Sequence, residues 1–303
     1  MFTNLGNFRV IGVYTPNEWH LGLQSIRIGR KKMQRFLSHL SASGLLAVLA
    51  FGLSLMSVSS TSAQTVDEII SRGKLIVAID TTTPPYGFLG DDLKPTGFDI
   101  EVANKMGEAL KVPVEFVTVT SPGRIPALLT KQVDAVISIF SITAERAIQI
   151  DYSIPYAGQS AVVIAPKSTA IKGHADLVGK KVGLVRGTGE DGLLTKAAEA
   201  NPGIEILRFD DYSSLLQAMV SGQIDAMGGG DYGEIYLKKA QNGDDFEQKY
   251  ILKTFYFGIG VAKGNDNLRQ WLNTWLFTLK ADGTLEALSM KYRNQPLPPL
   301  PVF

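Results

Sequence analysis

The feature that most constrains the fold is a short unit that occurs once in each half of the chain. Residues 128–136 read LLTKQVDAV and residues 219–227 read MVSGQIDAM. Each unit combines the end of a helix, a polar turn and the start of a strand that opens with Asp-Ala. Because the two units occupy the same place in two similar series of strands and helices, they predict two α/β lobes that are built alike.

In the first half, apolar runs typical of strands alternate with segments of helical periodicity. We expect strands at residues 75–79, 112–119 and 133–139, and helices at 99–110 and 125–130. Within 99–110, the apolar residues Ile100, Ala103, Met106 and Leu110 fall on one helical face. The β-α-β-α-β order predicts a mostly parallel sheet with helices on both faces.

The second half repeats this order and then departs from it. We expect strands at residues 181–185, 204–209 and 224–227, with helices at 191–200 and 213–221. A strand-like stretch at 255–261 is followed by two helical segments, 268–281 and 285–292, with no strand between them. Such helices must pack on an existing sheet, so we expect them to return to the first lobe.

The predicted domain organisation follows from that return. Residues 64–158 form the first part of lobe 1, residues 159–254 form lobe 2, and residues 255–303 complete lobe 1. The chain then crosses between the lobes twice, through two hinge strands. Ligands in α/β folds bind beyond the carboxyl ends of the strands, so a cleft between the lobes is the expected binding site.

The N-terminal segment has the order of a secretory signal peptide. Lys31, Lys32 and Arg35 precede an apolar run at residues 44–58, and small residues follow up to Ala63. The alternative is a single membrane anchor, but the run is shorter than the ~20 residues that a spanning helix needs. We therefore expect residues 1–63 to be a leader with an N-terminal extension, cleaved after Ala63, with translation starting at Met1 or at Met33.

Composition excludes several classes of function. Without residues 1–63 the chain has 24 basic and 28 acidic residues, a net charge of −4, which gives no reason to expect a nucleic-acid partner. The chain has no cysteine, and His174 is the one histidine outside the leader. A cysteine nucleophile, a lipidated N-terminal cysteine and a histidine-rich zinc site are therefore excluded. We expect no cofactor and no metal, and we expect a monomer.

The densest polar site lies at residues 138–146, which read SIFSITAER. A buried strand is expected to end there, with Ser141 and Thr143 at the start of a helix, where backbone N–H groups are free. Arg146 lies one turn further and can form a forked pair with a carboxylate. These groups together predict a carboxylate receptor. The alternative is that Thr143 only caps the helix and Arg146 lies on a solvated face.

A second candidate region is the loop at residues 83–88, which reads TPPYGF. Its two prolines stiffen the chain where the first strand ends. Tyr86 then becomes a candidate for the cleft wall, because tyrosine combines an apolar ring with a polar tip. The alternative is ordinary core packing of Tyr86 or Phe88.

In order and spacing, these motifs resemble the family 3 extracellular solute-binding proteins. The resemblance spans nearly all of residues 66–293 and rests on the following segments: 83–88, GFD at 97–99, RIPALL at 124–129, VDAVIS at 133–138, SITAER at 141–146, DYSIPY at 151–156, DLVGKKV at 176–182, GT at 187–188 and KADGT at 280–284. The resemblance implies a two-lobed type II periplasmic binding protein without enzymatic activity. Such a protein captures a polar amino acid for the permease of an ABC importer.

The resemblance also implies roles for individual residues. Arg146 matches the clamp on the ligand α-carboxylate, assisted by Ser141 and Thr188. Ser121 and Arg124 match positions that contact the ligand side chain in the glutamate/aspartate-binding branch, which favours an acidic ligand. Three further residues complete the predicted ligand-binding set: Tyr86, Phe98 and Asp231.

This sequence departs from the family pattern at three positions. Thr83 stands where relatives often have an aromatic residue, and Gly189 replaces a usual Thr or Ser. The aspartate that holds the ligand ammonium should come five residues after Asp225, where this chain has Gly230, and Asp231 is one residue late. Either the glycine run rotates Asp231 into place, or the ligand is a keto acid or another carboxylate.

Two rival functions remain open. Residues 187–192 match G-x-G-x-x-G with Asp210 about 20 residues further, a dinucleotide-binding pattern. Against it, Glu190 and Asp191 place negative charge where a pyrophosphate would bind. The second rival is a periplasmic dehydratase of prephenate-like acids, whose acid–base group would be Asp231, Glu190, Asp191 or His174. A binding protein of this fold could also serve a receptor in place of a permease.

Overall fold

A computed structural model describes residues 65–238 and 245–301. The predicted leader, its cleavage site after Ala63 and the alternative start at Met33 lie outside these residues. The first element is helix α3 (Val66–Arg72), which begins at Thr65 with a reciprocal pair of hydrogen bonds between Thr65 and Glu68. None of the helices in the described ranges combines the length and the apolar character needed to cross a membrane.

The first lobe is built on a five-stranded sheet. Its strand order is β5-β1-β6-β13-β7, with bounds Val114–Thr118, Leu75–Ile79, Ala135–Val136, Gly260–Ala262 and Ile150–Tyr152. The strands β5, β1 and β6 are parallel, and β13 is antiparallel to both of its neighbours. A small antiparallel sheet of β2 (Thr82–Thr83), β3 (Gly87–Leu89) and β4 (Pro95–Thr96) lies beside it. The helical elements of the first half are α4 (Phe98–Leu110), the 3-10 helix η1 (Ser121–Gly123), α5 (Arg124–Leu129) and α6 (Ala144–Ala147).

The second lobe repeats this topology. Its sheet has the order β10-β9-β11-β8-β12, with bounds Glu205–Phe209, Lys181–Val185, Ala226–Gly230, Ala157–Pro166 and Phe246–Phe257. The strands β10, β9 and β11 are parallel, and β8 is antiparallel to both β11 and β12. The helical elements are the 3-10 helix η2 (His174–Leu177), α7 (Gly189–Ala200), α8 (Tyr212–Val220) and α9 (Gly233–Leu237). Two lobes with mostly parallel sheets were predicted from the repeated unit.

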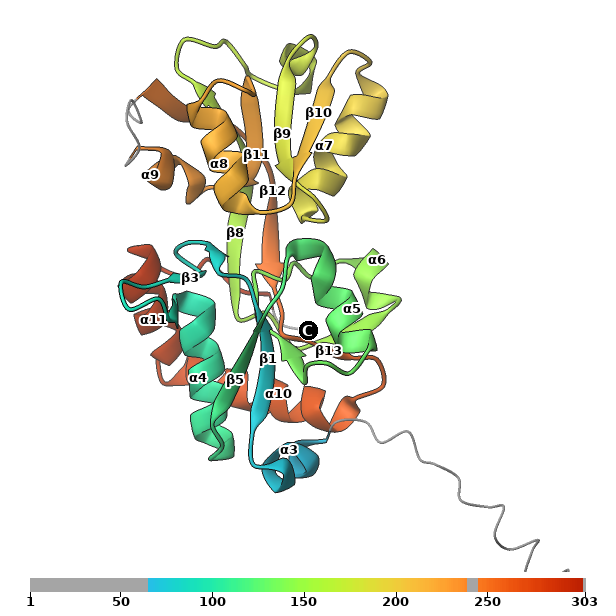
Figure 1. Ribbon diagram of the computed structural model, residues 1–303, viewed down its shortest axis with the longest axis vertical. Coiled ribbons are helices and arrows are strands. Elements are labelled where there is room, and N and C mark those ends of the chain that lie inside the picture. Colours follow the sequence, from blue (N-terminus) through green and yellow to red (C-terminus); the bar gives the residue numbers. More distant parts are fainter. Residues whose placement is uncertain (1–64, 239–244, 302–303) are drawn as a thin grey trace, which may run out of the picture. The chain divides into compact units, whose positions relative to one another are not determined.

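The strands β8 and β12 run side by side from one lobe into the other (Figure 1). They pair antiparallel from Ala157 opposite Phe257 to Pro166 opposite Phe246. The sequence predicted one strand at residues 255–261, whereas the structure has the end of β12, a break at Gly258 and then β13. Most of β12 is half-exposed and contains charged residues, so it lacks the continuous apolar run by which a strand is recognised.

The last two helices pack on the first lobe. Helix α10 (Asp266–Ala281) contacts α3, where Asn267 Oδ1 accepts a hydrogen bond of 3.0 Å from Val66 N. Helix α11 (Thr284–Arg293) contacts α4, where Tyr292 Oη donates to Glu101 Oε1 at 2.9 Å. The C-terminal segment therefore returns to the sheet on which the described chain begins.

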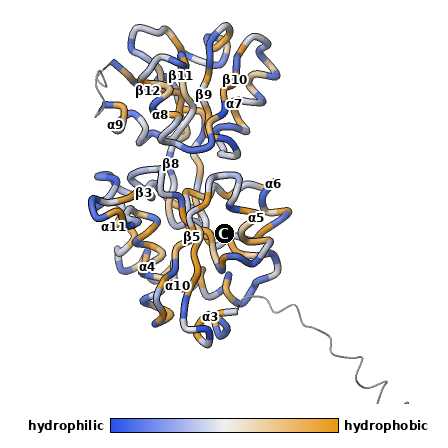
Figure 2. Tube along the Cα trace, in the orientation of Figure 1, coloured by the Kyte–Doolittle hydropathy of each residue, from blue (hydrophilic) through white to orange (hydrophobic). Residues whose placement is uncertain are grey.

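The core of the first lobe follows the predicted periodicity. The four apolar residues predicted for one face of α4, from Ile100 to Leu110, are buried. Gly107 lets α4 approach the sheet closely, since a Cβ at this position would lie 2.4 Å from Val114 Cγ2. Figure 2 shows hydrophobic stretches through the strands and inner helix faces of this lobe, with hydrophilic stretches at its outer turns.

Helix α10 allows a direct test of this packing. Leu276 is fully buried, while its neighbour Phe277 is 65% exposed. We expect Leu276→Ala to lower the free energy of unfolding by about 2–5 kcal/mol, because it removes buried methyl groups and leaves a cavity. Phe277→Ala is the matched control and should change it by less than about 0.5 kcal/mol. Urea denaturation measures both, and equal effects would contradict the assigned orientation of α10.

Candidate ligand-binding site

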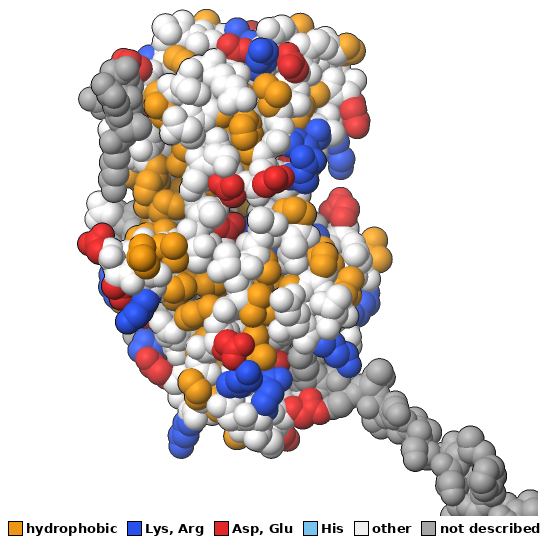
Figure 3. All heavy atoms as spheres, viewed as in Figure 1, with side chains coloured by type: hydrophobic (Ala, Val, Ile, Leu, Met, Phe, Trp, Pro, Cys, Tyr) orange, Lys and Arg blue, Asp and Glu red, His pale blue; other side chains and the backbone are white. Residues whose placement is uncertain are grey.

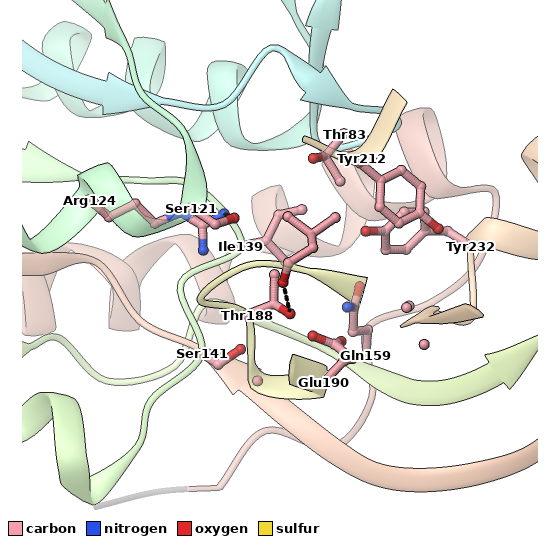
Figure 4. A pocket seen from close by; sticks show the side chains of 15 residues that line it. Thr83, Ser121, Arg124, Ile139, Ser141, Gln159, Thr188, Glu190, Tyr212 and Tyr232 are labelled. Carbon is pink, nitrogen blue, oxygen red and sulfur yellow. Dashed lines mark hydrogen bonds between the residues drawn. The ribbon is translucent and has the colours of Figure 1, made fainter. Parts of the chain in front are cut away.

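A cavity lies between the two lobes and is lined by residues of both. The first lobe contributes Thr83, Ser121, Arg124, Ile139 and Ser141. The second lobe and the crossing strand β8 contribute Gln159, Val185, Thr188, Gly189, Glu190, Tyr212, Gly228, Gly229, Gly230 and Tyr232 (Figure 4). The cavity volume is about 40 Å³, which is room for one or a few water molecules. An amino acid can therefore enter only when the cleft widens.

Strand ends deliver most of these side chains to the cavity. Ile139 and Ser141 follow β6, Thr188 follows β9, and Gly230 ends β11. In α/β sheets, ligands bind beyond the carboxyl ends of the strands. The two sheets therefore present their binding edges to each other across the cleft.

The lobes are in contact in this structure. Ser213 Oγ of α8 donates a hydrogen bond of 3.3 Å to the carbonyl oxygen of Thr82, and the rings of Tyr86 and Tyr232 meet edge-on at 5.3 Å. On the face shown in Figure 3, atoms of both lobes meet across the cleft, and acidic side chains gather along this line. The structure therefore represents a closed arrangement of the cleft.

Arg124 and Ser121 both line the cavity, and they are bonded to each other. Arg124 is buried, its Nη2 donates to Ser121 Oγ at 2.8 Å, and Asp80 Oδ2 lies 3.8 Å away. Burial lowers the pKa of Arg124, and the charge of Asp80 opposes this shift. Among the described residues, the Nε–H of Arg124 has no hydrogen-bond partner. A buried donor of this kind is available to a ligand.

Ser141 and Thr188 also line the cavity, one from each lobe. Thr188 caps α7: its hydroxyl accepts a hydrogen bond of 3.2 Å from Asp191 N and donates to the carbonyl oxygen of Val185 at 2.8 Å. Thr143 caps the single turn of α6 by accepting from Arg146 N, which is the structural role that the sequence left open for it.

Arg146 does not line this cavity but lies at its edge. Its Nη1 donates to the carbonyl oxygen of Ser141, and its Nη2 donates to that of Gly187, both at 2.8 Å. The guanidinium also lies over the ring of Phe140, 5.1 Å from its centroid. Arg146 therefore links the two lobes, and it faces a neighbouring hollow that shares Thr188 and Gly189 with the cavity. Its contact with a ligand stays a prediction.

Tyr86 and Phe98 lie behind the cavity and do not line it. Both are fully buried, and their rings meet edge-on at 5.9 Å. Tyr86 also packs edge-on against Phe257, at 5.7 Å. These contacts correspond to core packing, the alternative raised for Tyr86 from the sequence. Direct ligand contact by Tyr86 and Phe98 stays a prediction.

The position expected to hold the ligand ammonium has no room for a side chain. A Cβ at Gly230 would lie 2.1 Å from Cε1 of Tyr232 and 2.7 Å from Nε2 of Gln159. Asp231 does not line the cavity, because its Oδ2 accepts from Ser160 N at 3.2 Å and its own N–H donates to Ser160 O. In this structure the glycine run therefore does not turn Asp231 toward the cavity.

Sequence reasoning missed several of the lining residues. Gln159 lies in β8, Tyr212 begins α8, and Tyr232 follows β11. No sequence pattern around Gln159 or Tyr232 indicated a cavity position. The sequence of a strand or turn does not tell whether its side chains face the other lobe. Glu190 was named only as an acid–base candidate, although its place two residues after Thr188 could have indicated a cavity position.

In the glycine-rich loop at residues 187–192, a carboxylate of the loop itself accepts a hydrogen bond from a loop amide. Asp191 Oδ2 accepts from Gly187 N at 2.9 Å, and Asp191 Oδ1 pairs with Arg208 at 2.8 Å. A Cβ at Gly189 would lie 2.4 Å from the ring of Phe255. This carboxylate occupies a loop amide that a pyrophosphate would need, which argues against dinucleotide binding.

His174 lies away from the cavity. It belongs to η2, and its Nδ1 is 3.0 Å from the Oη of Tyr250 in β12. Within residues 65–238 and 245–301, the structure contains no group of three or more His, Cys, Asp or Glu side chains that could hold a metal ion.

Asp99 fixes the backbone at the cavity wall. Its Oδ2 accepts from Ile139 N at 2.8 Å, and its Oδ1 accepts from Tyr156 Oη at 2.9 Å. Ile139 has a φ of +43°, a left-handed conformation that is unfavourable for a β-branched residue. The Asp99 carboxylate therefore contributes to holding a strained residue that lines the cavity.

The chain belongs to a known family of binding proteins. The model of the bacterial extracellular solute-binding proteins, family 3, matches residues 75–295. This membership confirms the family inferred from the motifs, and the solved structures similar to the chain confirm the two-lobed type II fold.

Several individual proteins are similar to this chain. The L-cystine-binding protein TcyJ of Escherichia coli (strain K12) is 32% identical, covering 84% of this chain and 97% of its own. The ABC transporter arginine-binding protein 1 of the same strain is 32% identical, covering 73% of this chain and 91% of its own.

Two solved structures are also similar. A mutant of ArgBP from T. maritima has a TM-score of 0.70 with 30% identity, covering 76% of this chain and 99% of its own. An ancestral amino acid-binding protein, described as a precursor of cyclohexadienyl dehydratase, has a TM-score of 0.67 with 34% identity and the same two coverages.

The Asp99 carboxylate gives a testable pH dependence. Burial raises its pKa from 3.8 to about 7, although the bond from Ile139 N opposes the shift. Because the folded state then binds more protons than the unfolded state, Asp99 makes the free energy of unfolding fall as the pH rises from about 4 to about 7. We expect Asp99→Asn to remove a decrease on the order of 4 kcal/mol over this range.

Urea denaturation at several pH values between 4 and 7 measures this effect. Glu108→Gln, at an exposed position on the same helix, is the matched control and should keep the wild-type slope. An Asp99→Asn variant with the same slope as the wild type would contradict the raised pKa.

Proposed function

We propose that the chain captures a small amino acid, or a closely related carboxylate, in the cavity between its lobes. The observation that carries this proposal is a cavity lined from both lobes in which buried polar atoms lack partners among the described residues, including Arg124 Nε and Gln159 Oε1. Buried polar atoms are normally hydrogen-bonded, so a polar solute that satisfies both would stabilise the closed lobes. The relatives named for cystine, arginine and histidine binding support an amino acid as the solute.

The proposed cycle begins with the cleft open. The solute binds one lobe, and the second lobe closes over it. Only a solute that contacts both lobes shifts this equilibrium, because it must bind the closed form more tightly than the open form. We further propose that the protein acts as a monomer in the periplasm, after removal of residues 1–63, and that the permease of an ABC importer recognises the closed form.

Arg146 is the proposed partner of the solute carboxylate. Its guanidinium spans Ser141 O and Gly187 O, and thus uses two of its five N–H groups in these bonds. Ser141 and Thr188, on either side of it, line the cavity. A carboxylate at this edge of the cavity would meet the guanidinium and the Ser141 hydroxyl of one lobe, next to Thr188 of the other lobe, an arrangement that favours closure.

We propose more specifically that the solute is an amino acid with an acidic side chain. Arg124 is buried in the cavity with Ser121, so it can contact a second carboxylate on the solute side chain. Its Nε–H remains unpaired even though Asp80 lies 3.8 Å from its Nη2. A glutamate- or aspartate-like side chain would satisfy this donor.

A second candidate function keeps the fold and adds catalysis. Glu190 is buried in the cavity, and burial raises the pKa of its carboxyl, which suits a proton donor. One similar structure is that of a precursor of cyclohexadienyl dehydratase. Incubation of the purified protein with prephenate, followed by product analysis, tests this candidate. We expect binding proteins of this kind to give no turnover.

The proposed function is tested by identifying the small molecule that co-purifies with the protein. The full coding sequence is expressed, and the protein is purified from the periplasm without refolding. It is then denatured, and any released small molecule is identified by mass spectrometry and confirmed by calorimetric titration. Release of an amino acid supports the proposal. A protein that releases nothing and binds none of the twenty amino acids, cystine or their keto acids contradicts it.

The role of Arg146 makes a quantitative prediction. We expect Arg146→Ala to weaken binding of the identified solute by at least roughly 30-fold, about 2 kcal/mol, because a charge-assisted pair is lost at the half-buried edge of the cavity. Arg269→Ala, which removes an exposed guanidinium paired with Asp266 on α10, is the matched control. Calorimetric titration measures both, and wild-type affinity in Arg146→Ala would exclude the carboxylate role.

The role of Arg124 predicts a change of selectivity. We expect Arg124→Ala to alter which amino acid binds most tightly, with acidic amino acids losing the most affinity. A thermal-shift screen with the twenty amino acids and cystine, followed by titration of the best ligands, measures this. Loss of binding to every ligand would show that Arg124 acts on the part common to all amino acids and not on the side chain.

A further inference from the structure

One wall of the cavity has no side chains at all. It is formed by the end of β11, where Gly228, Gly229 and Gly230 line the cavity. A Cβ at Gly228 would lie 2.5 Å from Leu194 Cδ1, and one at Gly230 would meet the ring of Tyr232 at 2.1 Å. This wall therefore cannot supply a carboxylate to a solute cation without rebuilding its surroundings.

Glu190 supplies the carboxylate that this cavity does contain. It is the second residue of α7, it is 7% exposed, and it lines the cavity. The other nearby acids do not line the cavity: Asp80 lies 3.8 Å from Arg124, and Asp231 accepts a hydrogen bond from Ser160 N through its Oδ2.

Glu190 has no cationic partner in the described part of the chain. No lysine or arginine among residues 65–238 and 245–301 lies within 4 Å of its carboxylate. A buried and unpaired carboxylate is costly, and the positive end of the α7 dipole offsets only part of this cost. Accordingly, burial raises the pKa of Glu190, with smaller opposing effects from its own backbone N–H, Thr188 and Arg146.

A second acceptor lies on the same side of the cavity. Gln159 is 5% exposed, and its Oε1 has no hydrogen-bond partner in the part of the chain that the structure describes. Figure 4 shows Gln159 and Glu190 on the side of the cavity opposite Arg124 and Ser121. One side of the cavity therefore carries a carboxylate without a cationic partner and an unsatisfied amide oxygen, and the other side carries an unsatisfied guanidinium N–H.

We propose that Glu190, together with Gln159, binds the ammonium group of the solute, in place of the side chain that Gly230 does not supply. This inference rests on the proposed amino-acid binding and makes the amine of the solute a required group. An ammonium has three donors, and the Glu190 carboxylate and Gln159 Oε1 accept two of them. A solute without the amine leaves Glu190 buried and unpaired, so the site should reject it.

The test compares an amino acid with the same molecule lacking its amine. The most tightly bound amino acid is first identified with the wild-type protein from the twenty amino acids and cystine. Its affinity and that of its des-amino analogue, for example L-glutamate and glutarate, are then measured by titration for wild type and Glu190→Gln. We expect Glu190→Gln to lose at least 100-fold in affinity for the amino acid and to keep or gain affinity for the analogue.

Matched measurements separate this role from a structural one. Glu199→Gln changes an exposed position on the same helix and should keep wild-type affinity for both ligands. Because Glu190→Gln removes a buried unpaired charge, it should also raise the melting temperature of the ligand-free protein at pH 8. A folded Glu190→Gln protein that loses affinity equally for both ligands, or keeps it for both, would overturn the inference.

The same experiment distinguishes failure of the inference from failure of the proposed function. If the wild-type protein binds none of the tested amino acids, the amino-acid function itself is wrong, and the inference falls with it. If the wild type binds an amino acid but does not prefer it to the des-amino analogue, the function stands and the assignment of Glu190 is wrong.

Discussion

The pairing of β8 with β12 is the constraint on which the rest of the structure depends. These two strands are hydrogen-bonded to each other from Ala157 opposite Phe257 to Pro166 opposite Phe246, and they carry the chain across the cleft in both directions (Figure 1). Register shifts interrupt the ladder after Gln248 and after Ile251. Both shifts lie opposite residues 161–164 of β8, which also pair with β11 in the second sheet, whereas residues 157–160 pair with residues 254–257 without a break. The two crossing segments are therefore held together by a regular ladder.

The closed cleft concentrates opposite charges in a small buried volume. Arg124 and Glu190 both lie in the cavity with less than one-tenth of their surface exposed, on opposite sides of it. Burial strengthens electrostatic interactions and also makes unpaired charges costly. An amino acid carries both complementary charges. In the proposed function, closure is therefore coupled to the presence of a zwitterion, because a closed cleft without one leaves both groups partly unsatisfied.

Two departures from the family pattern, Gly189 and Gly230, line the same cavity as Glu190. Gly230 removes a carboxylate from β11, and Tyr232 and Gln159 fill the space next to it. Glu190 brings a carboxylate to the same cavity from α7, in the loop region where Gly189 also departs from the usual residue. Asp231 is the nearest replacement along the chain, but it is bonded to Ser160. Proximity in sequence was thus a poor guide to which acid lines the cavity.

The sequence by itself determined the order of strands and helices, the two similar lobes and the family. The strand end at residues 138–146 pointed to Ser141, and the family resemblance pointed to Ser121, Arg124 and Thr188; all four line the cavity. Only the tertiary structure decided that Tyr86 and Phe98 pack in the core, that Arg146 bonds to Gly187 of the other lobe, and that Gln159 and Glu190 line the cavity. These outcomes depend on contacts between segments far apart in the chain, and local periodicity carries no information about such contacts.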